Sequence, residues 1–208
     1  MASAAVTGYT GFIGKKLVEA LLKEGFTVYP VGRDFRHIDC DRVYHLASPS
    51  TTERIESNPT GVMDTIMDAT RAALKICPDA LFINASSKGA IDLAESPQGC
   101  YNVAKRSMET YIRFSGVKFL NYRIPSVYGP GMHESNFIKR CINGNAYAPL
   151  EPGKIHYIAH IDDVVDALVH LTEIKTEEIT LGEIYESFSS GRRGLYRPTS
   201  DTPVTRKG

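Results

Sequence analysis

The sequence predicts an α/β protein built on a doubly wound parallel sheet with helices on both faces. Short apolar segments of strand length alternate with longer amphipathic segments over most of the chain. Regularly spaced glycines follow the first apolar segment, and serines follow several of the later ones. This alternation favours parallel strands joined by helices, and ligands of such sheets bind beyond the carboxyl ends of the strands.

The first strand is predicted over 3–7 and the first helix over 12–24, with Gly8, Gly11 and Gly14 at their junction. A strand, a glycine turn and an amphipathic helix form the pyrophosphate-binding unit of a Rossmann-like fold. Gly8 allows the tight turn, Gly11 lets backbone N–H groups approach the phosphates, and Gly14 permits close packing of the helix. The alternative is a glycine turn that binds nothing.

The second strand is predicted over 26–31 and is followed by Gly32, Arg33 and Asp34. In dinucleotide folds an acidic residue here binds the adenosine ribose, whereas an arginine accommodates a 2′-phosphate. Arg33 holds the better position, so the sequence favours NADP over NAD. The alternative is that both charged residues only solvate a loop.

The remaining elements continue the alternation. Further strands are predicted near 42–47, 80–85 and 117–123, with a short one near 183–188, and helices near 61–76, 99–115, 134–143 and 162–174. We expect one NAD(P)-binding domain over 1–190, whose part from about 125 to 190 is a short substrate portion. For the basic tail 191–208 we weigh solvated disorder against a role in clamping a diphosphate.

Tyr101 and Lys105 are four residues apart within the helix predicted over 99–115, which places both side chains on one face. A fixed cation beside a phenol favours the phenolate, so we expect Lys105 to lower the pKa of Tyr101. Glu109, one turn further on, is interpreted as an ion-pair partner of Lys105. Tyr-x-x-x-Lys alone is a common chance pattern, so its context decides its weight.

Several further motifs occur in a fixed order: His45-Leu-Ala-Ser48, Phe82-Ile-Asn-Ala-Ser-Ser87, Arg123-Ile-Pro-Ser-Val-Tyr-Gly-Pro-Gly131 and His160-Ile-Asp-Asp-Val164. Together with the glycine turn and the Tyr101/Lys105 pair, they resemble the extended branch of the short-chain dehydrogenase/reductase superfamily, the NAD(P)-dependent epimerase/dehydratase family. The resemblance runs from about residue 3 to about residue 190.

The resemblance implies an epimerase or keto-reductase, with a nucleotide-sugar as its substrate. Tyr101 would be the general acid/base, Lys105 would bind the nicotinamide ribose, and Ser87, with Ser86 second, would bind the substrate oxygen. The implied cofactor-binding residues are Gly8, Thr10, Gly11, Phe12, Ile13, Gly14, Arg33, Leu46, Ala47, Ser48, Tyr101 and Lys105. The implied substrate-binding residues are Ser87 and Ser126.

The chain also departs from the family pattern. The segment before His45 is short enough that one strand–helix unit is missing or vestigial, and Asp64 or Thr65 stands where a site asparagine is expected. Lys88 follows Ser87 where a dehydratase needs an acid, which disfavours dehydration. A non-catalytic NAD(P) sensor or scaffold and a reductase of small non-sugar carbonyls therefore stay open. The resemblance also implies a homodimer through the helices near 61–76 and 99–115.

Composition agrees with a cytoplasmic enzyme that has neither a nucleic acid nor a membrane as partner, and the resemblance implies a small-molecule substrate. The 24 basic and 24 acidic residues cancel, and no apolar run reaches the length of a membrane span. The cysteines have no C-x-x-C spacing and are interpreted as reduced thiols. We expect no metal site, since His156 and His160 lie in an extended segment, and we expect Asp162 to cap the following helix.

Overall fold

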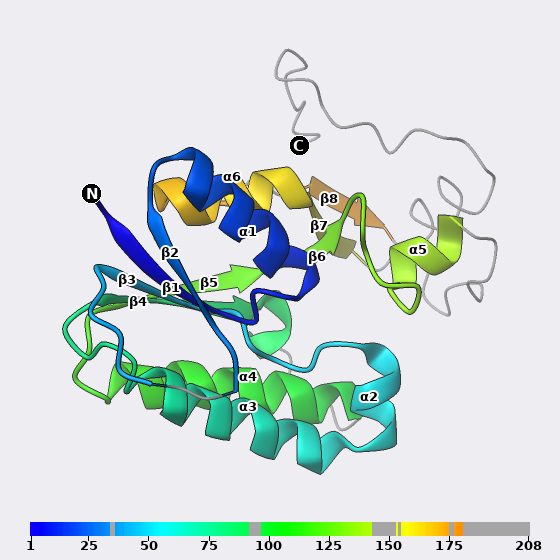
Figure 1. The fold of residues 1–208 in the computed structure, drawn as a ribbon. Coiled ribbons are helices and arrows are strands. Elements are labelled where there is room, and N and C mark those ends of the chain that lie inside the picture. Colours follow the sequence, from blue (N-terminus) through cyan, green and yellow to red (C-terminus); the bar gives the residue numbers. More distant parts are fainter. Residues whose placement is uncertain (34–35, 92–96, 143–152, 154, 175–176, 181–208) are drawn as a thin grey trace.

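The protein is described from a computed structural model, which covers residues 1–33, 36–91, 97–142, 153, 155–174 and 177–180 (Figure 1). Five parallel strands form the main sheet in the order β2-β1-β3-β4-β5. They are β1 (Ser3–Thr7), β2 (Thr27–Val31), β3 (Arg42–His45), β4 (Leu81–Ser87) and β5 (Phe119–Ile124). The strand order reverses at β1, so the carboxyl ends of β1 and β3 frame the crevice where such sheets bind ligands.

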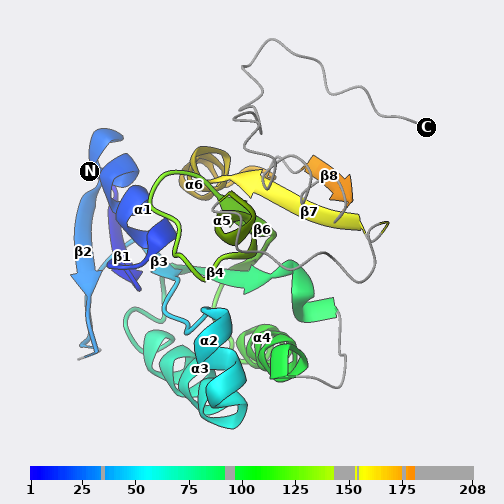
Figure 2. The same ribbon diagram turned by 90° about the vertical axis from the view of Figure 1, so that its right-hand side faces the viewer.

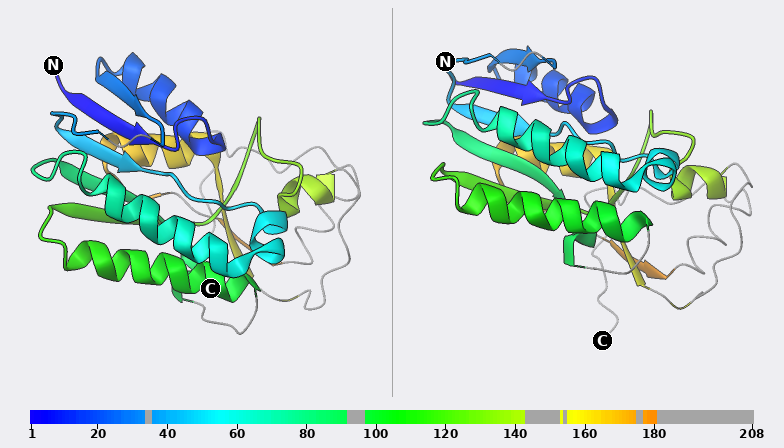
Figure 3. Two further views of the ribbon diagram at one scale, coloured as in Figure 1. Left: turned by 60° about the horizontal axis from the view of Figure 1, so that its bottom comes forward. Right: turned by 90° about the horizontal axis from the view of Figure 1, so that it is seen from below.

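Helices cover both faces of this sheet, which confirms the predicted doubly wound architecture (Figures 1 and 2). One face carries α1 (Phe12–Lys23) and α6 (Ile161–His170). The other carries α3 (Pro59–Ala73) and α4 (Pro97–Arg113), which run side by side along the sheet (Figure 3). The short helix α2 (Thr52–Ser57) precedes α3.

Alternation along the strands divides the core between the two faces. On β1, Ala4 and Val6 pack toward α1 and α6, whereas Ala5 packs toward α3 and α4. All three are fully buried, as expected for a parallel strand covered on both sides. On α3, Val62 and Ile66 are buried in the core on the α3–α4 side, so the apolar face of this helix packs into the core.

A second, three-stranded sheet adjoins the carboxyl ends of the main strands, with the order β6-β7-β8. Its strands are β6 (Ser126–Tyr128), β7 (Ile155–His160) and β8 (Glu177–Thr180), and the helix α5 (Phe137–Ile142) lies beside it (Figure 2). The separate elements α2, β6, β8 and the 3-10 helix η1 (Lys88–Ile91) were not predicted. The strand predicted near 183–188 and the tail 191–208 lie outside the described residues.

The strand–helix unit that the sequence suggested was missing is indeed absent from the described residues between β2 and β3. As a result β2 is an edge strand of the main sheet, with β5 at the other edge. None of the described helices combines the length and the apolar character that a bilayer span requires.

The start of α6 differs from the prediction. Its N-cap is His160, whose Nδ1 accepts a hydrogen bond from the backbone N of Asp162 at 3.3 Å. Asp162 therefore lies within the first turn, where a carboxylate interacts favourably with the positive end of the helix dipole. It also forms an ion pair with Lys16 of α1 at 3.8 Å. The prediction of Asp162 as N-cap was wrong because the imidazole accepts the bond in its place.

Candidate functional site

The turn between β1 and α1 brings the backbone unusually close to its neighbours. Gly8 has φ of +67°, and a Cβ there would lie 2.7 Å from the backbone N of Ala47. A Cβ on Gly14 would lie 2.1 Å from the carbonyl oxygen of Gly8. Gly11 is the N-cap of α1 and offers no side chain to the first-turn N–H groups. The turn is thus a cradle of backbone donors that a side chain would fill, which fits a pyrophosphate.

A buried histidine fixes the adjacent strand ends. The Thr7 hydroxyl lies 3.0 Å from Nδ1 of His45, and the Thr70 hydroxyl lies 3.1 Å from Nε2. The Thr70 hydroxyl already donates to the carbonyl of Ile66, so it accepts from Nε2–H, and Nδ1 accepts from Thr7. Burial, reinforced by the charge of Lys105, lowers the pKa of His45 to about 3. His45 is therefore a neutral structural residue beside the crevice.

Lys105 on α4 is 4% exposed, and its Nζ donates a hydrogen bond to the carbonyl oxygen of Ala85 on β4 at 2.8 Å. Burial lowers the pKa of this ammonium to about 8, against a smaller raising effect of Glu109. The same Nζ lies 5.7 Å from the centroid of the Tyr101 ring. The predicted pair on one helix face is therefore present.

The electrostatics of Tyr101 differ from the expectation. Burial raises the pKa of this phenol to about 12, and a hydrogen bond with Ser48 opposes the rise only in part. The lowering expected from Lys105 is not seen, because the Nζ lies over the ring face and donates to a backbone carbonyl. The protein's own groups therefore keep Tyr101 protonated at neutral pH.

The two serines at the end of β4 have different partners. Ser86 is buried and donates to Glu109 Oε1, and Glu109 also accepts two hydrogen bonds from Arg123, at 3.0 and 2.8 Å. The partner of Glu109 is thus Arg123, and the expected ion pair with Lys105 is wrong. Ser87 accepts a bond from the backbone N of Gly89 at 3.1 Å, and its hydrogen stays available to a ligand oxygen.

These residues meet in a cavity of about 310 Å³ at the carboxyl ends of β1, β3 and β4. Its lining includes ten of the predicted site residues: Gly8, Gly11, Phe12, Ile13, Gly14, Leu46, Ser48, Ser87, Tyr101 and Lys105. Four are not among the lining residues: Thr10, Arg33, Ala47 and Ser126. Thr10 and Arg33 are exposed. The backbone N of Ala47 donates a hydrogen bond to the Thr7 hydroxyl, which joins the segment after β3 to the end of β1.

A second cavity of about 690 Å³ adjoins the first and shares Phe12, Ser87 and Asn136 with it. Ser126 lines this second cavity. Asp64 and Thr65 line neither cavity and are exposed on α3.

Sequence reasoning missed several polar lining residues, of which three illustrate the reasons. Ser50 and Asn136 line both cavities, and Asn102 lines the second. Asn102 directly follows Tyr101, so its helix position could have indicated it. Ser50 and Asn136 lie in loops whose path depends on α2 and β6, and no local pattern reveals them.

The curated relatives that the chain matches include UDP-glucuronic acid decarboxylases. It is 26% identical to UDP-glucuronic acid decarboxylase 3 of Arabidopsis thaliana, over 81% of this chain and 65% of that protein. It is 25% identical to UDP-glucuronic acid decarboxylase 1 of Xenopus tropicalis, over 80% of this chain and 52% of that protein. The chain thus spans between about half and two thirds of the length of these relatives.

Solved structures share the fold. UDP-glucose 4-epimerase of Thermus thermophilus, in complex with NAD, has a TM-score of 0.71 at 20% identity and matches 90% of this chain and 82% of that one. A human epimerase family protein with NADPH has a TM-score of 0.73 at 18% identity and matches 90% of this chain and 79% of that one.

The model of one family matches residues 4–185, which include the glycine turn, the Tyr101/Lys105 pair and the β6–β7 segments. That stretch contains both cavities and nearly all described elements. The chain belongs to the NAD dependent epimerase/dehydratase family.

Proposed function

We propose that this protein is an NAD(P)-dependent epimerase or keto-reductase that acts on a nucleotide sugar, with Tyr101 as general acid/base. One observation supports this most strongly. The glycine turn, Ser87 on β4, and Tyr101 with Lys105 on α4 come from three separate segments and line a single cavity. Chance placement of a Tyr-x-x-x-Lys pattern would not bring it to a phosphate cradle.

The cofactor would lie along this cavity. The first-turn N–H groups of α1 would hold the pyrophosphate, and the Lys105 ammonium, fixed by Ala85, would bind the nicotinamide ribose. When bound, the dinucleotide supplies the acceptor or donor of a hydride. We favour NADP over NAD because Arg33 follows the edge strand β2, where its exposed guanidinium can reach a 2′-phosphate.

Tyr101 would exchange the proton of the substrate oxygen while the attached carbon gains or loses hydride. Its raised pKa suits the donation of a proton to an alkoxide that forms during reduction. In the reverse direction the positive charge of Lys105 would help to stabilise the phenolate. Ser87 would hold the substrate oxygen by a hydrogen bond, since the hydroxyl of Ser86 is already bonded to Glu109.

A nucleotide sugar is the substrate class that the relatives support. Their names include UDP-glucuronic acid decarboxylases and a UDP-glucose 4-epimerase. The second cavity, next to Ser87, has room for a sugar. Lys88 at its edge disfavours a dehydratase, which needs an acid at that place.

The test is Tyr101→Phe, measured with oxidised and reduced dinucleotides over a panel that includes UDP-glucose and UDP-glucuronic acid. We expect turnover to fall roughly 10²- to 10⁴-fold, the usual contribution of general acid/base catalysis, while dinucleotide affinity by calorimetry changes little. Tyr111→Phe is the matched control, because Tyr111 is an exposed tyrosine on the same helix. Turnover of Tyr101→Phe within a few-fold of the parent would refute the proposal.

The same preparation separates the alternatives. Oxidised dinucleotide that copurifies supports an epimerase, which returns the hydride to its product, whereas cofactor-free protein supports a reductase. Dinucleotide binding without turnover on any sugar or simple ketone supports a non-catalytic sensor. Activity on simple ketones alone supports a carbonyl reductase.

A further inference from the structure

The second cavity, which Ser87 lines, has a positively charged side chain and no carboxylate in its described lining. Its described lining contains one lysine, Lys88, two histidines, His133 and His156, and neither aspartate nor glutamate. The rest of its polar lining is made of hydroxyls and amides. A cavity with a fixed positive charge and no opposing carboxylate in its described lining favours an anionic ligand.

The ammonium of Lys88 is placed by an aromatic ring. Its Nζ lies 4.9 Å from the ring centroid of Tyr157 on β7, a cation–π contact that positions the charge without neutralising it. The ion pairs found among the described residues involve other cations. Lys88 therefore keeps its hydrogen-bonding capacity for a ligand.

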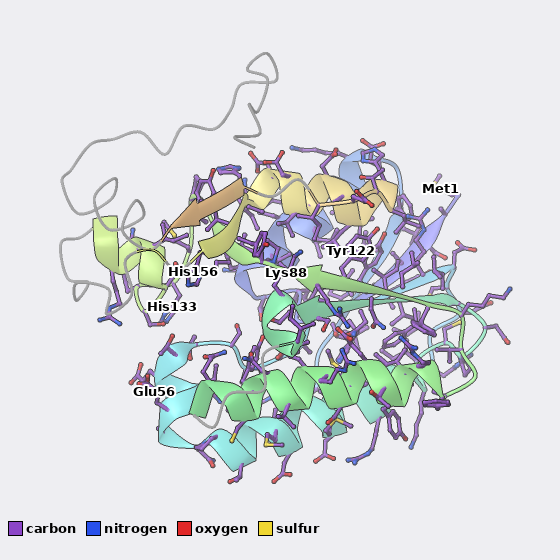
Figure 4. All side chains as sticks on the ribbon, turned by 180° about the vertical axis from the view of Figure 1, so that it is seen from behind. Met1, Glu56, Lys88, Tyr122, His133 and His156 are labelled. Atoms are coloured by element: carbon purple, nitrogen blue, oxygen red, sulfur yellow. The ribbon has the colours of Figure 1, made fainter. Side chains whose placement is uncertain are left out.

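Of the two histidines, His133 adds a hydrogen-bond donor to this lining. Nδ1 of His133 accepts a hydrogen bond from the backbone N of Ser135 at 3.1 Å, which leaves the proton of the neutral ring on Nε2 as a donor. His156 lies on β7 next to Tyr157. In Figure 4 the labelled Lys88, His133 and His156 lie between the helices α2 and α4 and the small sheet.

The position of Lys88 in the chain fixes where an anion would sit. Lys88 directly follows Ser87, so their Cα atoms are about 3.8 Å apart. Both residues also line the second cavity, so the ammonium of Lys88 borders the same space as the substrate oxygen that Ser87 would hold. A diphosphate handle that enters from elsewhere in the cavity lies further from the reacting carbon. An acidic group on the sugar itself is the anion that fits this place.

We propose that Lys88 binds a carboxylate on the sugar ring and that the protein therefore selects an acidic sugar nucleotide over its neutral counterpart. The inference rests on the proposed function, because the sugar must enter the cavity next to Ser87. Lys88 acts here as a specificity residue, and the hydride and proton transfers stay with the groups named above.

The experiment uses calorimetric titration of the dinucleotide-loaded protein with UDP-glucuronic acid and with UDP-glucose. The two ligands share the diphosphate and differ in the carboxylate. We expect the acidic ligand to bind roughly 10- to 100-fold more tightly, as for a charge-assisted hydrogen bond. Lys88→Met should remove this difference by weakening only the acidic ligand, and Lys88→Arg should retain part of it.

Lys23→Met is the matched control, since Lys23 is an exposed lysine at the far end of α1, and it should leave both affinities unchanged. Equal affinities for the two ligands would overturn the inference. An equal loss for both in Lys88→Met would also overturn it, because Lys88 would then bind the shared diphosphate. Either result leaves the dependence on Tyr101 intact, so it is distinct from a failure of the proposed function.

Discussion

The burial of the Lys105 ammonium in the site has a cost in folding free energy. A buried ammonium with one backbone hydrogen bond has lost most of its hydration, and burial lowers its pKa from 10.5 to about 8. Between these two pH values the unfolded chain binds more protons at this residue than the folded chain. The contribution of Lys105 to stability therefore rises with pH across this window.

We predict that the free energy of unfolding of the parent protein rises by about 2 kcal/mol, relative to Lys105→Met, between pH 7.5 and 9.5. Urea unfolding of both proteins at the two pH values measures it, and other titrating groups cancel in the difference. A difference that does not change with pH would mean that Lys105 keeps an ordinary pKa in the folded protein.

The individual residues of the site could be predicted where local spacing decides their place. Tyr101 and Lys105 share a helix face because they are four residues apart. The partner of Glu109 could not be predicted in this way, since Arg123 comes from β5 and only the sheet brings it to α4. The pKa of Tyr101 depends on burial by several elements, which no local pattern contains.

At the level of elements, the turn between β1 and α1 leaves no room for an added side chain at Gly8. Gly8 and Gly25 both have positive φ, +67° and +79°, but only Gly8 has backbone atoms where a Cβ would stand. We predict that Gly25→Ala costs about 1 kcal/mol of unfolding free energy, the conformational penalty alone. Gly8→Ala should cost at least about 2 kcal/mol more, because its Cβ must displace Ala47.

Urea unfolding of the two variants gives the comparison, and calorimetry with dinucleotide extends it. Gly25→Ala serves as the control for backbone strain and should bind dinucleotide like the parent. Gly8→Ala should lose at least about tenfold in affinity, since the phosphate cradle shifts. Equal stability of the two variants would contradict the close approach of Gly8 to the backbone of Leu46 and Ala47, just after β3.

Glu109 joins three elements, as it accepts hydrogen bonds from Ser86 of β4 and Arg123 of β5. Burial alone would raise the pKa of Glu109, but these bonds outweigh it and hold the pKa below the usual value. The stability that Glu109 contributes is present above its ordinary pKa of 4.5 and is lost as pH falls through the lower folded value.

We predict that Glu109→Gln unfolds more easily at pH 7 and that its disadvantage shrinks below pH 4.5. Thermal unfolding from pH 7 to pH 3 measures the effect, with Glu19→Gln on the exposed side of α1 as a control. A disadvantage of Glu109→Gln that persists unchanged at pH 3 would argue for packing, not charge, as its role.

The alternation of apolar segments was enough to predict the main sheet and its long helices. The helix α2 and the strand β6 escaped prediction because they are too short for periodicity to show. Strand β6 also has its only described partner in β7, which lies far along the chain, so its pairing is a tertiary property. For that reason the predicted substrate-binding residues included only Ser87 and Ser126 from the lining of the second cavity, which also contains residues of α2 and β6.

At the scale of the whole molecule, the two cavities share residues and run from the glycine turn to the small sheet. The turn between β1 and α1 supplies the phosphate cradle, α4 supplies the Tyr101/Lys105 pair, and the small sheet supplies Tyr157 and His156. Under the proposed function, the dinucleotide would lie on the side of the main sheet and the substrate on the side of the small sheet.

The helices near 61–76 and 99–115, through which a homodimer is expected, have exposed aromatic side chains at one end. Tyr111 and Phe114, at the end of α4, are 43% and 81% exposed, although both are large and apolar. They line a groove of about 730 Å³ together with Met67 and Leu74 from the α3 side. Exposed aromatic residues around a groove between two long helices are typical of a protein interface.

We predict that Phe114→Glu converts a dimer into a monomer, because it removes an exposed aromatic ring from the groove and puts there a carboxylate that must lose hydration when the surface is covered. Sedimentation velocity over a range of protein concentrations measures it, and the dissociation constant should rise at least about 100-fold. Leu22→Glu is the control, since Leu22 is 56% exposed on α1, on the opposite face of the sheet, and should leave the dimer intact. If the parent protein sediments as a monomer at all concentrations, or if Phe114→Glu dimerises as tightly as the parent, the α3–α4 surface does not mediate self-association.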